Sequence, residues 1–362
     1  MKKVLIVFNH PAPYKVRLFN ELAKHFDLHV IFERSSASDR NKKFYFEKEY
    51  DFKIHKIKGI KIGKENFISN QIVKHLKNNS YDLIIMNGYS QFAEMKAIRY
   101  LKMQNISYVL YINGGTIKEK EPKLKYKIKK YFISGAKYYL SPDEESNKYL
   151  IHYGAEKDKI FNYPYSTIYE KEILREKPNK DENKKKLGIK YDKVFVSSGQ
   201  LIKRKNYFSL VKEWKNMPKN YGLYIFGDGK EKNKIAKFVK REKLENVILK
   251  GFTSHKEMFE FYKASDAFLF PSKQDIYGHV VNEALSQGVP IISSKNVNSS
   301  LHLIKENENG FLLNKFDSRS MLETIEKLSQ KESFNNCINT AKKNTIELMR
   351  DAHVDIIKGA LK

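Results

Sequence analysis

The feature that most constrains this chain is a regular alternation of short apolar runs with longer segments of helical periodicity. Short apolar runs are typical of buried strands, and the period of the segments between them is typical of helices. Strands that alternate with helices indicate βαβ units and a parallel sheet. In the first half the predicted strands are Val4–Phe8, Leu28–Phe32, Leu83–Met86 and Tyr108–Ile112, and the predicted helices are Arg17–Phe26, Ser69–Asn78 and Phe92–Met103.

A second series of the same kind follows a polar, lysine-rich segment, Glu176–Lys186. Its predicted strands are Val194–Ser197, Leu223–Phe226, Val247–Leu249, Ala267–Leu269 and Pro290–Ser293. The sequence therefore predicts two doubly wound α/β domains, 1–170 and 171–343, with a linker near 165–190 and an amphipathic C-terminal helix within 344–362. In such sheets, ligands bind beyond the carboxyl ends of the strands.

The segment 271–293 reads as a strand end, a loop, a helix, a glycine and a strand. Asp275 falls in the loop and Glu283 lies in the first part of the helix, with Gly278 and the backbone amides of the helix start between them. A helix N-terminus carries unpaired N–H groups and the positive end of a dipole, which suits a phosphate. Carboxylates accept hydrogen bonds from sugar hydroxyls. The segment could therefore hold a sugar diphosphate at both ends.

This segment resembles the donor site of family 4 glycosyltransferases, which belong to the group 1 glycosyltransferases. The matching positions are Pro271, Ser272, Gly278, Glu283, Ala284, Gly288 and Pro290. Asp275 stands where the family usually has Glu, which keeps the charge but shortens the side chain by one methylene. The resemblance implies a GT-B fold, in which two Rossmann-like domains face each other across a cleft and the C-terminal helix crosses back toward the first domain.

A second loop, which follows the strand 194–197, resembles the same family. Gly199, Gln200 and Lys205 lie where the family has a Gly-Arg pair and a Lys, and that Arg and Lys grip the donor diphosphate. Lys205 matches the family Lys, whereas Gln200 replaces the Arg and so keeps a donor but loses the charge. Arg204 or Lys203 could compensate for that loss, although neither occupies the aligned position.

Further along, Gly227 follows the next strand in a Gly-x-Gly pattern, and glycines let the backbone approach a ligand closely. By resemblance, the backbone around Phe252 and Thr253 lies near the nucleotide base, Glu283 holds the ribose, and Asp275 holds a hydroxyl of the donor sugar. The resemblance implies Lys205, Asp275 and Glu283 as catalytic residues. The implied donor-binding residues are Gly199, Gln200, Arg204, Lys205, Gly227, Phe252, Thr253, Asp275, Tyr277, Gly278, His279, Val280 and Glu283.

The first half offers candidates for the acceptor side, because they follow predicted strands. These candidates are His10, Tyr14, Asn87, Asn113 and Gly114. His10 could equally cap a helix or bond locally, and 87–90 could equally be a plain βα turn. Many relatives place a His near position 113, but this chain has none there, so no enzymic base is assigned. That fits a retaining transfer in which the donor phosphate helps to remove the acceptor proton.

The formal net charge of +26, from 68 Lys and Arg against 42 Asp and Glu, favours polyanionic partners. Lys118–Phe132 has the pattern of a basic amphipathic helix at a membrane surface, with Leu124, Ile128 and Tyr131 on one face. The same pattern fits a helix whose apolar face packs inward, and the lysine content also fits a coding bias. We expect an anionic membrane surface as a partner, no nucleic acid, and a cytoplasmic, peripheral location on the inner face of the cell membrane.

No metal and no other cofactor are expected. The chain contains no Asp-x-Asp pair, and its single Cys337 excludes an internal disulfide and a cysteine metal cluster. Fixed cations and a helix dipole could stabilise the diphosphate instead. The predicted enzyme is a hexosyl- or N-acetylhexosaminyl-type glycosyltransferase that moves a sugar from a nucleotide sugar to a lipid-linked surface glycan. A sugar-nucleotide epimerase of the same architecture, a non-catalytic partner subunit and, from charge alone, a nucleic-acid binder remain alternatives.

Overall fold

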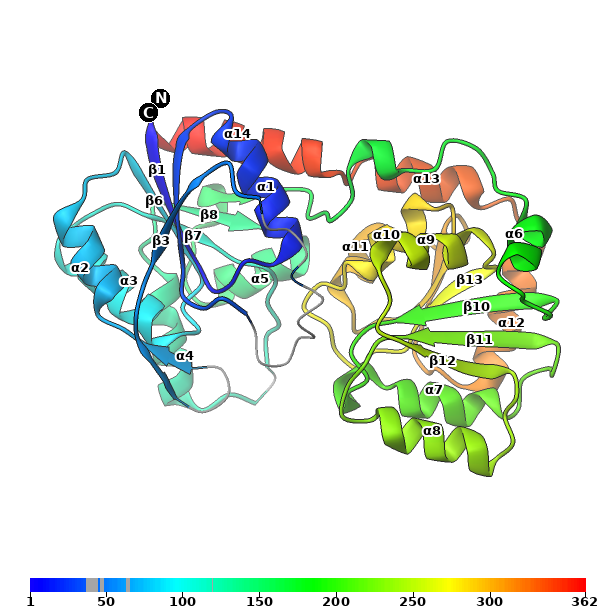
Figure 1. Cartoon of the computed structure of the whole chain (residues 1–362). Coiled ribbons are helices and arrows are strands. Elements are labelled where there is room, and N and C mark those ends of the chain that lie inside the picture. Colours follow the sequence, from blue (N-terminus) through cyan, green and yellow to red (C-terminus); the bar gives the residue numbers. More distant parts are fainter. Residues whose placement is uncertain (37–44, 46–48, 63–65, 119) are drawn as a thin grey trace. The chain divides into compact units, whose positions relative to one another are not determined.

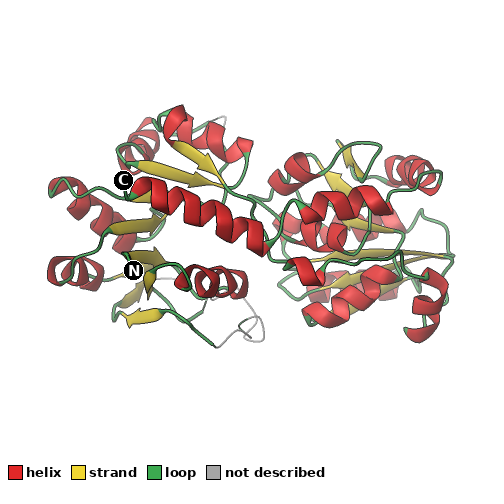
Figure 2. Ribbon diagram, turned by 90° about the horizontal axis from the view of Figure 1, so that it is seen from above, coloured by secondary structure: helices red, strands yellow, loops and turns green. Residues whose placement is uncertain are grey.

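The computed structural model describes residues 1–36, 45, 49–62, 66–118 and 120–362. The chain divides into two compact units: unit 1 comprises 1–165 and 346–362, and unit 2 comprises 166–345. Each unit is built on its own parallel sheet with helices packed against it (Figure 1; Figure 2). None of the helices within the described ranges has both the length and the apolar character that a membrane span needs.

Unit 1 contains a seven-stranded sheet with the order β3-β2-β1-β6-β7-β8-β9. Its strands, all parallel to their neighbours, are β1 (Lys3–Phe8), β2 (Asp27–Phe32), β3 (Lys53–Lys56), β6 (Leu83–Asn87), β7 (Val109–Tyr111), β8 (Tyr138–Ser141) and β9 (Ile160–Asn162). A separate antiparallel pair is formed by β4 (Ile60–Ile62) and β5 (Asn66–Ile68). The strand order reverses between β1 and β6, and such a switch point is where ligands bind in doubly wound sheets.

The helices of unit 1 are α1 (Pro13–Ala23), α2 (Gln71–Asn78), α3 (Phe92–Met103), α4 (Lys123–Ile133), α5 (Glu144–His152) and α14 (Ile346–Ala360). The predicted start of the first helix at Arg17 is wrong, because Pro13 supplies a φ angle that suits the first helical position. α14 buries Met349, His353 and Ile357 and packs against α1. Its Arg350 lies 3.4 Å from the Glu21 carboxylate of α1.

Unit 2 contains a six-stranded parallel sheet with the order β12-β11-β10-β13-β14-β15. Its strands are β10 (Lys193–Ser198), β11 (Tyr221–Phe226), β12 (Val247–Gly251), β13 (Ala267–Phe270), β14 (Ile291–Ser294) and β15 (Gly310–Leu313). The order reverses between β10 and β13. This arrangement is the dinucleotide-binding type of doubly wound sheet, and the reversal predicts a ligand at the ends of those two strands.

The helices of unit 2 are α6 (Lys180–Lys186), α7 (Tyr207–Trp214), α8 (Lys232–Arg241), α9 (His255–Lys263), α10 (Val280–Ser286), α11 (Asn298–Leu303), α12 (Ser318–Ser329) and α13 (Phe334–Lys342). The segment 165–190 differs from the predicted linker. Ile168 and Ile173 are buried in the core of unit 2, and the lysine-rich run 180–186 forms α6, whose cap is the Asn179 side chain. Because Ile168 and Ile173 are isolated apolar positions in the sequence, the sequence did not predict that this stretch is part of a core.

Candidate functional site

The loops that follow β10, β11 and β12 are bound to one another by backbone hydrogen bonds. The Gly199 N–H donates to Phe226 O (3.0 Å), and the Gly227 N–H donates to Gly251 O (2.7 Å). Gly227 has a φ of +128°, and a Cβ there would lie 1.9 Å from the Gly199 carbonyl oxygen. Only glycine fits this position. The glycine pattern, which predicted a close approach of the backbone to a ligand, is therefore explained first by the close packing of these two loops.

The loop 271–279, after β13, is fixed from two sides. The Lys273 N–H donates to Arg204 O (2.9 Å) in the β10 loop, and the Asp275 N–H donates to Asn296 O (2.9 Å) after β14. Gly278 has a φ of +100°, and a Cβ there would lie 2.7 Å from the Phe270 ring. The structure therefore holds the β10 and β13 loops together at the switch point of the sheet.

Lys205 and Asp275 form a buried ion pair between these two loops. Lys205 ends the 3₁₀ turn Lys203–Lys205, and its ammonium donates a hydrogen bond to Asp275 Oδ2. Lys205 is 9% exposed and Asp275 is 6% exposed, and Arg204 Nη1 lies 3.5 Å from Asp275 Oδ1. Burial alone would raise the pKa of Asp275, but the charges of Lys205 and Arg204 lower it below its usual value. Asp275 is therefore ionised and already holds two cations.

Glu283 lies in the first turn of α10 within a different set of contacts. Its Oε1 accepts a hydrogen bond from Thr167 Oγ1 (3.0 Å) and lies 3.6 Å from His255 Nε2. Burial would raise the pKa of this carboxyl, but the interactions with His255, the charge of His279 and the Thr167 hydroxyl lower it. Sequence reasoning missed both partners. Thr167 fell in the predicted linker, and His255 follows Thr253 by only two residues, which could have drawn attention to it.

The other predicted donor residues lie around these two clusters. Val280 begins α10, and the Tyr277 ring, which is 3% exposed, lies 5.1 Å from the His279 ring. Gln200 follows Gly199 in the β10 loop, whereas Phe252 (39% exposed) and Thr253 follow β12. The structure thus brings Arg204, Lys205 and Asp275 into direct contact. Backbone hydrogen bonds join Gly251 at the end of β12 to Gly227, and Phe226 to Gly199 in the β10 loop.

In unit 1, three of the acceptor-side candidates belong to one neutral hydrogen-bond chain. Asn113 Nδ2 donates to Asn87 Oδ1 (2.8 Å), Tyr165 donates to Asn113 Oδ1 (2.8 Å), and the Tyr165 and Tyr14 hydroxyls lie 3.3 Å apart. Gly114 follows this chain with a φ of +133°. The His10 ring contacts the Tyr45 hydroxyl at 3.3 Å. Tyr165 was not predicted, because it lies in the segment assigned as a linker.

Titratable groups at this edge of unit 1 are buried, and the sequence analysis did not predict them. Lys15 is fully buried and donates to the Tyr111 hydroxyl, with its ammonium 4.3 Å from the centres of the Tyr111 and Tyr165 rings. Burial lowers its pKa well below the usual value. Glu33, directly after β2, is 2% exposed, and burial together with the neighbouring Glu94 raises its pKa to about 9. The alternating pattern of apolar residues does not indicate that either of these two side chains is buried.

No group of three or more His, Cys, Asp or Glu side chains with the geometry of a metal site occurs among the residues that the structure describes. The side chains gathered in unit 2 are instead cations, carboxylates and hydroxyls on loops of fixed backbone. Such a set can bind a phosphorylated ligand through Lys205 and Arg204 and hydroxyl groups through Asp275 and Glu283.

Residues 179–344 match the family model described as Glycosyl transferases group 1, and all of them lie in unit 2. An uncharacterized glycosyltransferase of Methanocaldococcus jannaschii is 30% identical over 200 residues, 52% of this chain and 48% of that protein. The capsular polysaccharide biosynthesis glycosyltransferase CapM of Staphylococcus aureus is 28% identical over 186 residues, 48% of each chain. These matches span about half the length of the curated relatives.

A crystal structure of HepE from Anabaena in complex with UDP superposes with a TM-score of 0.80 at 14% sequence identity, covering 99% of this chain and 100% of that one. At this identity the likeness concerns the fold alone. It agrees with the two parallel sheets described above, so the predicted architecture of two Rossmann-like units is confirmed.

Proposed function

We propose that this chain, which carries a group 1 glycosyltransferase domain on a GT-B fold, transfers a sugar from a nucleotide sugar to a surface-glycan acceptor. The observation that carries the proposal is the pair Lys205–Asp275, buried between the β10 and β13 loops at the switch point of unit 2. A fixed ammonium in a poorly hydrated place stabilises charge that develops on a leaving diphosphate. Arg204, 43% exposed at its side chain, can supply a second cation to the same group.

Within this proposal, Glu283 accepts hydrogen bonds from the ribose of the nucleotide. Its lowered pKa keeps it an acceptor throughout the neutral range. Asp275 holds Lys205 in place and shares its remaining acceptor capacity with a hydroxyl of the donor sugar. Charge on the diphosphate is then offset by side chains of this chain, so we propose a reaction that needs no metal ion and that retains the configuration of the transferred sugar.

We propose the neutral chain of Tyr14, Asn87 and Asn113 as part of the acceptor side. Amide and hydroxyl groups can both donate and accept, which suits the hydroxyls of a sugar. The S. aureus relative is named for capsular polysaccharide biosynthesis, which supports a surface glycan as the acceptor class.

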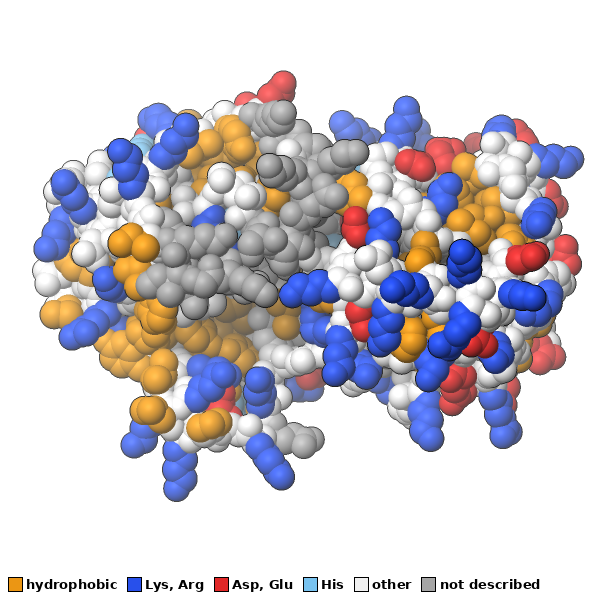
Figure 3. All heavy atoms as spheres, turned by 60° about the horizontal axis from the view of Figure 1, so that its bottom comes forward, with side chains coloured by type: hydrophobic (Ala, Val, Ile, Leu, Met, Phe, Trp, Pro, Cys, Tyr) orange, Lys and Arg blue, Asp and Glu red, His pale blue; other side chains and the backbone are white. Residues whose placement is uncertain are grey.

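An anionic membrane surface is proposed as the place of the reaction, and the side chains of α4 support it. Leu124 (71% exposed), Ile128 (42%) and Tyr131 (44%) are exposed, so the alternative that this face packs inward is wrong. Figure 3 shows apolar side chains gathered on unit 1 with Lys and Arg beside them. An exposed apolar face with flanking lysines fits adsorption to anionic lipid and a lipid-linked acceptor.

One lysine of this helix differs from the rest. Lys129 is only 14% exposed at its side chain, and its ammonium lies 2.7 Å from the Glu121 carboxylate and donates to the Tyr153 hydroxyl (2.9 Å). It is therefore part of the internal packing of unit 1. The lysines available to a membrane are Lys123, Lys125, Lys127 and Lys130, which are exposed.

The proposal is tested by screening nucleotide sugars for thermal stabilisation of the purified chain, followed by assay of sugar release and transfer with the best donor. A ligand that binds only the folded state raises its stability, so the right donor should stand out. Sugar release should persist in excess EDTA. Stabilisation without release or transfer would favour a non-catalytic partner subunit, and conversion of the donor to an isomer would favour an epimerase.

A further inference from the structure

Unit 2 contains a cavity of about 280 Å³ at the edge of the sheet opposite the candidate site. Phe195 near the start of β10, Ala267 at the start of β13 and Pro290 directly before β14 all line it. The loops of the candidate site follow the other ends of these strands. The cavity is therefore separate from the proposed donor site, and what it binds does not depend on the proposed function.

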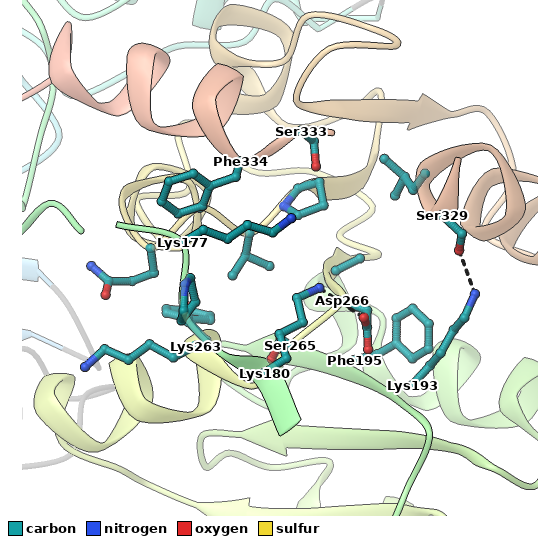
Figure 4. A pocket seen from close by; sticks show the side chains of 18 of the residues that line it. Lys177, Lys180, Lys193, Phe195, Lys263, Ser265, Asp266, Ser329, Ser333 and Phe334 are labelled. Carbon is teal, nitrogen blue, oxygen red and sulfur yellow. Dashed lines mark hydrogen bonds and ion pairs between the residues drawn. The ribbon is translucent and has the colours of Figure 1, made fainter. Parts of the chain in front are cut away.

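Lysines dominate the charged groups around this cavity. The lining contains Lys177, Lys180, Lys193, Lys263 and Lys331, against the two carboxylates of Asp266 and Glu332. Figure 4 shows the ammonium ends of Lys177 and Lys180 pointing toward the middle of the cavity and that of Lys263 pointing away from it. The excess of cations predicts an anionic occupant.

The lysines differ in how firmly they are held. Lys180 lies 3.0 Å from Asp266, whose other oxygen accepts from the Val194 N–H, so this pair is fixed. Lys177 lies 2.9 Å from Glu332, but both side chains are more than half exposed, and such a pair is readily exchanged for another anion. Lys331 donates to Asn307, a neutral partner. Lys177 and Lys331 can thus turn to a ligand without leaving a buried carboxylate unpaired.

Ser333 adds a polar group that is buried and aimed into the same space. It is 9% exposed, it directly precedes α13, and its side chain does not cap that helix. Its hydroxyl makes no capping hydrogen bond to that helix, and Figure 4 shows it directed toward the cavity. The first N–H groups of a helix also lack intrahelical partners and favour an anion. A hydroxyl, a helix start and the Lys177 ammonium thus border one cavity, and Lys331 also lines it.

Apolar rings form the rest of the wall. Phe195, Tyr262 and Phe334 line the cavity and are almost fully buried. A free inorganic ion leaves such a surface uncovered, whereas a small organic body covers it. The volume lies just below the range of roughly 300–1,000 Å³ for ligand pockets, so the occupant is small.

We propose that this cavity is a second ligand site, which binds the phosphate group of a small phosphorylated sugar. The phosphate lies between Ser333, the N-terminus of α13 and the ammonium groups of Lys177 and Lys331. The carbon skeleton lies against Phe195 and Phe334. The ligand contacts Gln287 and Gly288 at the carboxyl end of α10, whose first turn contains Glu283, so occupancy also reaches the helix of the donor site.

The test is isothermal titration of the full chain with inorganic phosphate and with glucose 6-phosphate, at constant ionic strength. Ser333→Asp is the decisive variant, because Asp at this position caps α13 and preserves folding while its carboxylate repels the phosphate. We expect binding to weaken by about tenfold or more in Ser333→Asp, since a hydrogen bond to a charged group is lost and a like charge is added. The double variant Lys177→Gln with Lys331→Gln should weaken it likewise.

Two controls locate the binding. Lys263→Gln removes a lysine of the lining that points away, and it should bind phosphate as the unmodified chain does. Arg204→Gln alters the proposed donor site, so loss of binding in that variant alone would place the phosphate there and overturn the proposal. Undiminished binding by Ser333→Asp would overturn it as well. If glucose 6-phosphate binds no more tightly than inorganic phosphate, the assignment of the carbon skeleton to the apolar wall is refuted.

Discussion

The two units place their loops on the same kind of sheet edge but use opposite electrostatics there. In unit 2, Asp275 and Glu283 stay ionised, because cations and hydrogen-bond donors lower the pKa of each against the effect of burial. In unit 1, burial dominates: the pKa of Glu33 is raised to about 9 and that of Lys15 is lowered. Unit 2 is thus equipped for a charged ligand, whereas unit 1 offers neutral amides and hydroxyls. The difference agrees with the proposed division, in which a charged nucleotide donor binds one unit and a neutral sugar acceptor binds the other.

The largest effect is expected from Lys205→Ala. The variant removes a cation from the proposed diphosphate site, and loss of one such donor lowers kcat by about 10²- to 10³-fold. It also leaves the buried Asp275 carboxylate without its main partner, which costs about 3–5 kcal/mol of folding stability. Stopped assays and urea unfolding measure the two effects. The double variant Lys205→Ala with Asp275→Asn should regain stability but not activity, and recovery of both would refute the catalytic assignment.

A second prediction concerns the exposed lysines of α4, which belong to unit 1 but not to its proposed acceptor site. Replacing Lys123, Lys125, Lys127 and Lys130 by Gln removes four charges, each worth about 1 kcal/mol on an anionic membrane. Co-sedimentation with vesicles that contain an anionic lipid should fall sharply, and binding by the unmodified chain should decrease as salt rises.

The matched control removes the same charge from unit 2, at the exposed Lys234, Lys237, Lys240 and Lys256. It should bind vesicles almost as well as the unmodified chain. Equal losses in the two variants would show that net charge, and not α4, directs the protein to the membrane.

Glu283→Gln should weaken donor binding by about 1.5–3 kcal/mol, the value of a hydrogen bond to a charged group. Because the pKa of Glu283 is lowered in the folded protein, its contribution to stability is present above its unfolded pKa and is lost as the pH falls through the folded pKa. Titration with the nucleotide diphosphate measures the first effect, and acid unfolding of the variant measures the second. Unchanged donor affinity would disprove the proposed ribose contact.

Glu33→Gln tests the opposite behaviour of unit 1. The raised pKa means that the folded protein keeps a proton that the unfolded chain loses, so Glu33 reduces stability as the pH rises from its unfolded pKa to about 9. One such group contributes a slope of at most about 1.4 kcal/mol per pH unit. Unfolding measured from pH 6 to 9 should be less dependent on pH in the variant. An identical slope in both proteins would show that Glu33 is ionised in the folded state.

The smallest effect is expected from Asn113→Ala in unit 1. Loss of one neutral hydrogen bond costs about 1 kcal/mol, which should raise the KM for the acceptor several-fold and leave donor hydrolysis unchanged. Tyr165→Phe removes the hydroxyl that donates a hydrogen bond to Asn113, and this variant should behave in the same way. A defect in donor hydrolysis would contradict the division of roles between the units.

The sequence by itself determined the architecture and the loops of unit 2. Apolar runs such as Val194–Ser197 and the helix Phe92–Met103 were readable because burial imposes a local period on the chain. The segments Gly199…Lys205 and Asp275…Glu283 were found by their resemblance to a glycosyltransferase family, and glycine, cations and a helix start close together in sequence suit the proposed phosphate site.

Only the tertiary structure decided which side chains meet. Lys205 and Asp275 are 70 positions apart, and Thr167 and Glu283 are 116 apart. It also decided that Tyr165 joins Asn113, that Lys129 turns inward while Leu124 stays exposed, and that Glu33 is buried beside Glu94. Ion pairing and pKa depend on distance and dielectric environment, which packing creates and which no local pattern of residues contains.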